Sequence, residues 1–103
     1  RLLYGHDLQE LKEFYFETLG ELISYDQEQK TEMMATLYAY LHSGGDMTKT
    51  ADSLFLHRNT LRYRLNRIEE ILDLSLDDVE TRLNLLTAFR IGNLKGFARS
   101  EGG

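Results

Sequence analysis

The sequence predicts an all-α domain of five helices, one of them part of a helix-turn-helix. Proline is absent from the 103 residues, and apolar residues recur at spacings of three and four along most of the chain. This length suits one compact domain with a single core. Hydrophobic residues make up 42% and charged residues 28%, a balance typical of globular domains, so neither disorder nor a membrane span is expected.

A first helix is expected from Asp7 to about Leu22. Asp7 and Glu10 have the spacing of a capping box, in which two side chains satisfy the first free amides of a helix. The aromatic residues 14–16 give this helix more apolar surface than one face needs. We therefore regard residues 1–25 as a leading helix and linker, and as the candidate dimer element.

The second helix is expected to begin after Asp26 and to end near His42. Gly44 and Gly45 follow, and glycine readily takes the left-handed conformation that ends many helices. Asp26 is the expected N-cap, because a short carboxylate accepts hydrogen bonds from the first amides of a helix. This helix and the three that follow it make the predicted core.

A short helix and a longer helix, separated by a turn, are expected next. The short helix begins at Met47 after Asp46 as its N-cap and ends near Phe55. The longer helix runs from Arg58 to Leu72, and its apolar residues are spaced by four, three and four. These residues are Leu61, Leu65, Ile68 and Leu72. One side of the longer helix is therefore expected to be buried.

The fifth helix is expected to start at a second capping box, Asp77 with Glu80, and to end near Ile91. Its inward residues are expected to be Val79, Leu83, Leu86 and Phe89. The helix-turn-helix core is thus placed at residues 26–92, and the tail at 93–103 is expected to fray.

The charges are distributed unevenly along the chain. A net charge of −5 disfavours DNA binding as an average, because DNA is a polyanion. Between Lys49 and Arg67, however, five basic residues stand against one acid, Asp52. The local charge is +4, which leaves −9 for the rest of the chain. A basic stripe on an acidic body is therefore predicted.

A short helix, a tight turn and a longer helix with cations opposite its apolar side are what the major groove of DNA requires. Winding at about 100° per residue turns Asn59, Arg62, Tyr63 and Asn66 away from the apolar side. The candidate DNA-binding residues are Lys49, His57, Arg58, Asn59, Thr60, Arg62, Tyr63, Arg64 and Arg67.

Roles follow from side-chain chemistry. Arg58 and Arg62 match the two acceptors of guanine, Asn59 matches adenine, and His57 suits either a base or a phosphate. The residues expected to contact phosphates are Lys49, Thr60, Tyr63, Arg64 and Arg67. A homodimer on double-stranded DNA is expected, because one short recognition helix covers only a few base pairs.

The string LFLHRNTLRYRL, residues 54–65, resembles the signature of the carboxy-terminal domain of the PucR and CdaR type of bacterial regulators. The resemblance extends over about 19–94 and implies a separate amino-terminal region that senses an effector. The two helices are also similar to those of the nucleoid protein Fis. That likeness favours Thr60 and Arg64 as contacts, whereas winding favours Asn59. Phe55 departs from a generic helix-turn-helix, whose turn often holds glycine.

Other classes of function have weaker support. The runner-up is a helical interaction or dimerisation module whose basic stripe meets an acidic protein. An enzyme ranks third, and neither a cofactor nor a metal is expected, because His6, His42 and His57 lie on separate segments. Cysteine is absent, which fits a cytoplasmic protein. The chain opens without Met, so we interpret it as a piece of a longer protein.

Overall fold

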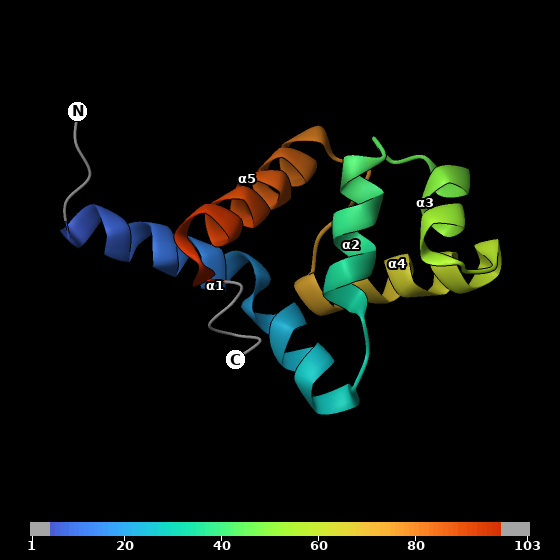
Figure 1. The fold of residues 1–103 in the computed structure, drawn as a ribbon, viewed down its shortest axis with the longest axis horizontal. Helices are drawn as coiled ribbons and strands as arrows, with labels where there is room; N and C mark the ends of the chain where they lie inside the picture. The colour runs from blue at the N-terminus through green and yellow to red at the C-terminus, as the bar shows by residue number, and fades with distance from the viewer. Residues whose placement is uncertain (1–4, 98–103) are drawn as a thin grey trace.

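The computed structural model describes residues 5–97, which fold into five helices and no strand (Figure 1). The helices are α1 (Gly5–Gln29), α2 (Met33–His42), α3 (Met47–Leu54), α4 (Arg58–Leu72) and α5 (Val79–Lys95). The prediction of an all-α domain is confirmed. No helix in this described part is long and apolar enough to cross a membrane.

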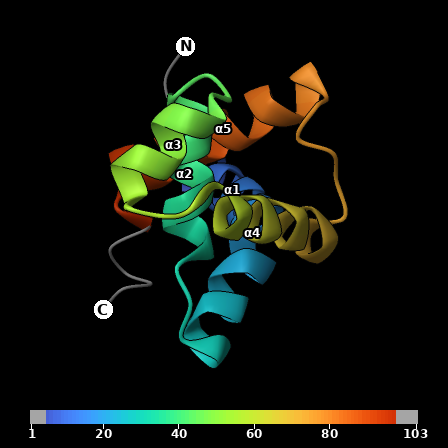
Figure 2. The ribbon, with the colours of Figure 1, turned by 90° about the vertical axis from the view of Figure 1, so that its right-hand side faces the viewer.

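The helices surround one core, with α3 and α4 on one side of the molecule. α1 packs against α5, α2 and α4, while α2 also packs against α3 (Figure 1). Figure 2 shows α3 and α4 on the side that faces the viewer, with α1 behind them. Fully buried core residues include Tyr15, Leu19, Leu22, Leu37, Leu61, Ile68, Leu85 and Ala88.

The predicted junction between the first two helices is wrong. α1 continues to Gln29, so Asp26 lies inside α1 and not in front of a new helix. Its carboxylate nevertheless accepts hydrogen bonds from the backbone amides of Met33 (2.7 Å) and Met34 (2.8 Å) and from the Thr31 hydroxyl (2.6 Å). Asp26 therefore caps α2 from the last turn of the preceding helix, which satisfies amides that a helix start leaves free.

The start and the buried side of α5 also differ from the prediction. Asp78, not Asp77, is the N-cap, and the helix runs on to Lys95. Val79 and Leu83 were expected to point inward, but they are 57% and 53% exposed. The side packed against the core consists of Leu85, Ala88, Phe89 and Gly92. α5 therefore carries apolar residues on two sides, and only one of them is buried.

The aromatic residues near the start of α1 pack within the chain. The Tyr15 ring lies 4.9 Å from that of Phe16 and 5.7 Å from that of Phe97, measured between ring centroids. Phe14 is half-buried against the same core. The expectation of fraying from residue 93 is wrong as far as Phe97, which is buried, and residues 98–103 lie outside the described residues. Phe14 and Phe16 remain only half-buried, and a dimer element within residues 1–25 stays a prediction.

Replacing Gly92 by alanine should destabilise the fold. A Cβ at this position would lie 2.3 Å from Cε1 of the buried Tyr15 ring, so the ring or α5 would have to move. We expect a loss of about 1–3 kcal/mol in the free energy of unfolding. The usual helical Gly→Ala change gains roughly 0.5–1 kcal/mol instead. Urea unfolding measures the difference.

Gly20→Ala in α1 is the matched control, because its new Cβ would meet only Phe16 Cβ at 3.9 Å, an ordinary contact. This variant should be at least as stable as the native chain. A Gly92→Ala protein that equals or exceeds the native stability would contradict the packing of α5 on α1.

Asp26→Ala should weaken the start of α2. The variant leaves two backbone amides without their acceptor, and loss of a capping carboxylate costs about 0.5–2 kcal/mol. Thermal unfolding followed by circular dichroism measures the loss. Glu28→Ala, a change of the same charge at an exposed position of the same helix, should leave the melting temperature nearly unchanged. Equal melting temperatures for both variants would refute the capping role.

Candidate nucleic-acid interface

α3 begins as the sequence predicts. The Asp46 side chain accepts a hydrogen bond from the Lys49 amide at 2.9 Å, which confirms Asp46 as the N-cap. Ala51, only 6% exposed, offers little bulk on the side that meets the rest of the domain. Its carbonyl accepts a hydrogen bond from the Leu56 amide at 2.9 Å, which closes the end of α3. The short helix is thus held at both ends by local hydrogen bonds.

The turn between α3 and α4 contains a strained aromatic residue. Phe55 has φ 56° and ψ 42°, the left-handed conformation that glycine takes most readily. Its amide donates to the Asp52 carbonyl at 3.2 Å, so the turn keeps its hydrogen bonds despite the bulky side chain. The ring itself is 94% exposed. The residue that departs from a generic turn therefore adopts the conformation that such a turn needs.

His57 has a structural role at the start of α4. It is the N-cap, and its Nδ1 accepts a hydrogen bond from the Asn59 amide at 3.1 Å. An accepting Nδ1 carries no proton, so Nε2 is the ring atom that can face an outside partner. His57, which is predicted to bind DNA, therefore also stabilises the start of α4 when no DNA is bound.

α4 is anchored on one side and polar on the other. It spans Arg58–Leu72, as predicted, and Leu61, Leu65 and Ile68 are buried. The side chains at the opposite positions are exposed, and Tyr63 is 62% exposed. The exposed polar and aromatic residues of this helix and its cap are His57, Arg58, Asn59, Thr60, Arg62, Tyr63, Asn66 and, near the carboxyl end, the acid Glu70. The predicted orientation of the helix is confirmed.

The arginines of α4 differ in how firmly they are held. Arg58 is exposed, and its guanidinium donates to the Thr48 hydroxyl on α3 at 3.2 Å. Arg62 is exposed and has no hydrogen bond or ion pair within the described residues. Arg64 is half-buried and donates to the hydroxyl of Thr36 on α2 at 3.0 Å. Freedom to move is greatest at Arg62.

Arg67 is the most constrained of these cations. Its Nε donates to the Tyr25 hydroxyl at 3.4 Å, its other nitrogen forms an ion pair with Glu70 at 2.9 Å, and it lies 5.3 Å from the Tyr25 ring centroid. The hydrogen bonds to Tyr25 and Glu70 raise the pKa of the Arg67 guanidinium above its ordinary value. Arg67 joins α4 to α1, a role that the sequence analysis did not assign to it.

Four partners of these arginines were missed from the sequence: Glu70, at the local i+3 spacing that favours helical ion pairs, and Thr36, Thr48 and Tyr25. Thr48 lies ten residues from its arginine, within the same helix-turn-helix. Thr36 and Tyr25 lie 28 and 42 residues from theirs, on helices that only the tertiary fold brings close. No local spacing signals such pairs.

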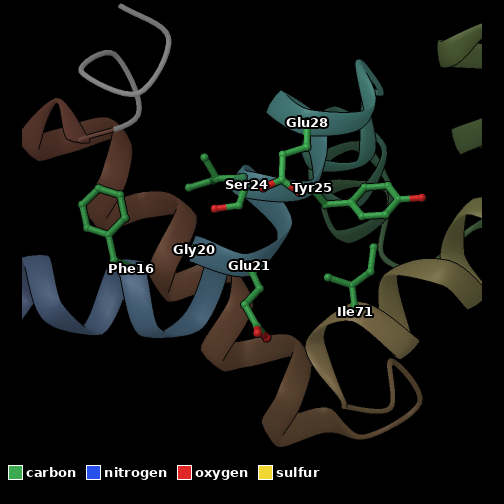
Figure 3. A pocket seen from close by; sticks show the side chains of 8 residues that line it. Phe16, Gly20, Glu21, Ser24, Tyr25, Glu28 and Ile71 are labelled. Carbon is green, nitrogen blue, oxygen red and sulfur yellow. The ribbon is translucent and has the colours of Figure 1, made fainter.

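The surface away from α3 is partly acidic. A hollow of about 690 Å³ lies between the second half of α1 and the end of α4, and Glu21 and Glu28 line it (Figure 3). The Tyr25 ring points from α1 toward α4, which carries Ile71. Two carboxylates and no cation among the lining residues make this hollow unsuitable for phosphate. Among the described residues, no group of three or more His, Asp or Glu is placed to hold a metal.

Comparison with known proteins relates the chain to bacterial regulators. Residues 33–91 match the profile of a family described as "PucR C-terminal helix-turn-helix domain". The chain is 40% identical over 87 residues to the "Purine catabolism regulatory protein" of Bacillus subtilis, covering 84% of this chain and 16% of that protein. It is 37% identical over 76 residues to the "Proline-responsive transcriptional activator PutR" of the same bacterium, covering 74% and 18%.

A third relative is the "Carbohydrate diacid regulator" of Escherichia coli, 43% identical over 56 residues, which covers 54% of this chain and 14% of that protein. The chain therefore spans less than a fifth of the length of these relatives. No solved structure matches the chain significantly.

Phe55→Gly should stabilise the fold. Glycine removes the strain of the left-handed conformation, worth about 1 kcal/mol, and the exposed ring has little packing to lose. Phe55→Ala removes the ring but keeps the strain, so it should unfold at nearly the native urea concentration. Only the glycine variant should unfold at a higher one. A glycine variant less stable than the alanine variant would contradict this account of the turn.

Proposed function

Because the chain belongs to the family of PucR C-terminal helix-turn-helix domains, we propose that it is the DNA-binding domain of a transcriptional regulator that reads a specific sequence with α4 in the major groove. The observation that supports this most is the two-sided character of α4. Three apolar residues fix the helix to the core, while the side from 57 to 66 presents exposed donors and acceptors. A major groove admits one helix in this manner.

The first turns of α4 are proposed to read bases. Arg62 is exposed and free of partners in the described part of the chain, and an arginine fork matches O6 and N7 of guanine. Arg58 is proposed for a second guanine, which requires its guanidinium to leave Thr48. Asn59, exposed in the first turn, has the amide geometry that pairs with adenine.

The flanking residues are proposed to contact phosphates. Lys49, Thr60 and Tyr63 are exposed beside the proposed reading side. Arg64 is expected to contribute less because it is half-buried against Thr36. Arg67 is expected to contribute least, since a phosphate would have to replace Glu70 and Tyr25 as its partners. His57 is proposed to reach the DNA through Nε2.

The regulator is proposed to sense its signal outside this domain. The relatives named for purine catabolism, proline and carbohydrate diacids share this carboxy-terminal segment, but it makes up less than a fifth of each. A segment that these relatives share is better explained by a shared activity, DNA binding, than by the recognition of three different signals. We propose a cytoplasmic, non-enzymatic protein that binds as a homodimer to two half-sites about 34 Å apart.

Arg62→Ala should reduce binding to the preferred duplex, first identified by selection from random DNA. Loss of a two-pronged base contact costs about 1–3 kcal/mol, or roughly 5- to 150-fold in affinity, and relaxes preference at one base pair. Fluorescence anisotropy with labelled duplex measures both changes. Lys12→Ala removes the same unit charge from an exposed position on α1 and should bind as the native chain does.

Two results would overturn the proposal. The first is a folded Arg62→Ala protein with native affinity and native sequence preference, because Arg62 is the freest of the candidate readers. The second is a native chain that prefers no sequence and whose affinity does not fall with salt. A DNA-binding domain should instead lose affinity with a log–log slope of about −0.9 for each phosphate contacted.

A further inference from the structure

α5 exposes a row of apolar residues that the fold does not use. Val79, Leu83 and Leu94 are 57%, 53% and 72% exposed, and Leu86 lies half-buried between them. Their spacing places all four within about 80° of one another around the helix axis. We call these four residues the outer stripe of α5. Single exposed apolar residues are ordinary, but three of them aligned with the half-buried Leu86 on one helix are typical of an interaction surface, and Arg90 lies in the same arc.

A groove of mixed polarity adjoins the outer stripe on the side of α2. This groove of about 310 Å³ between the two helices is lined by Leu86, Phe89 and Arg90 of α5 and by Tyr38 and His42 of α2. Tyr38 is 40% exposed, and its ring stacks on that of His42 with 3.9 Å between centroids. The stripe and the groove together give a contact area wider than one helix ridge.

The charges around the outer stripe are separated along the helix. Acids cluster at the amino end, at Asp77, Asp78 and Glu80, whereas the exposed bases Arg90 and Lys95 lie toward the carboxyl end. None of these side chains forms an ion pair within the described residues. A base near the amino end, Arg82, is half-buried and donates to the Leu76 carbonyl at 2.8 Å.

This distribution is complementary to itself in one orientation. An antiparallel pair of α5 helices sets the acidic end of each helix against the basic end of the other and opposes their macrodipoles. A parallel pair would set acids against acids. Two-fold symmetry makes every such contact occur twice, as in most protein homodimers.

We propose that a second copy of this chain packs on the outer stripe of α5, antiparallel, about a two-fold axis near Leu86. Val79 then faces Leu94 of the partner subunit, and Arg90 lies within about one turn of Glu80 of the partner subunit. The inference deepens the proposed function, because it names the surface that joins two recognition helices. It is an alternative to the start of α1, whose aromatic residues pack partly against the core.

The association is expected to be weak in the isolated chain. Stable dimers bury roughly 800 Å² on each partner, and we expect one stripe with its groove to bury less than that. We expect a dissociation constant on the order of 10–100 µM. Further contacts elsewhere in a longer protein would lower this dissociation constant without changing the surface.

Sedimentation equilibrium without DNA, from about 10 µM to about 1 mM, tests the proposal. The native chain should pass from monomer to dimer. Leu83→Lys should raise the dissociation constant at least tenfold, because it removes an apolar contact and places a second cation beside Arg90 of the partner subunit. Asn84→Lys, the same charge placed one residue away on the other side of the helix, should dimerise like the native chain. Circular dichroism confirms that both variants fold.

A charge exchange tests the orientation. Arg90→Glu alone should weaken the dimer, and combining it with Glu80→Arg should restore the dimer if the helices are antiparallel. A native chain that stays monomeric at the highest concentration, or a Leu83→Lys variant that dimerises normally, would overturn the inference. A monomeric chain that still prefers one DNA sequence would refute the dimer surface but leave sequence-specific DNA binding intact. A dimer without such a preference would refute sequence-specific DNA binding but leave the dimer surface intact.

Discussion

The burial of three residues on one side of α4, Leu61, Leu65 and Ile68, determines how the rest of the domain is used. These side chains are 0–7% exposed and lie among residues of α1 and α2. Burying the apolar side fixes the rotation of the helix about its own axis, and this in turn fixes the direction in which Arg62 and Tyr63 point. The outward side therefore needs no stabilising contacts of its own, and it is free to carry groups suited to a ligand.

Local chemistry was sufficient to predict some elements from the sequence and insufficient for others. The bounds of α4 and the cap at Asp46 follow from residues within one turn, so they could be predicted. Asp26 caps a helix that starts seven residues later, after the chain has reversed, and no capping pattern describes that geometry. α5 failed for a different reason: it has two apolar sides, and only the position of Tyr15 beside Gly92 decides which is buried.

The same distinction applies to the candidate site. Periodicity predicts which side chains of α4 leave the core, but it cannot distinguish a free arginine from one that is held elsewhere. Arg64 and Arg67 are held by residues 28 and 42 positions away, whereas Arg62 is not held. Arg64 and Arg67, which are held by α2 and α1, lie in the middle of α4 or beyond, and Arg58 in the first turn is held only by an exposed hydrogen bond to Thr48. The part of the helix that can rearrange around a ligand is thus its amino half, which is also where recognition helices penetrate the groove most deeply.

The charge distribution links α4 to α5. A single basic segment of +4 on a body of −9 is expected to give weak attraction to bulk DNA, because the acidic surface would repel phosphates that lie beyond the proposed contact. Such a domain gains affinity mainly where its exposed arginines meet matching bases. Pairing two copies through α5 would double those base contacts while neutralising part of the acidic surface at the helix ends. Specific binding would then gain more from dimer formation than non-specific binding, since each mismatched half-site loses its own share of the contacts.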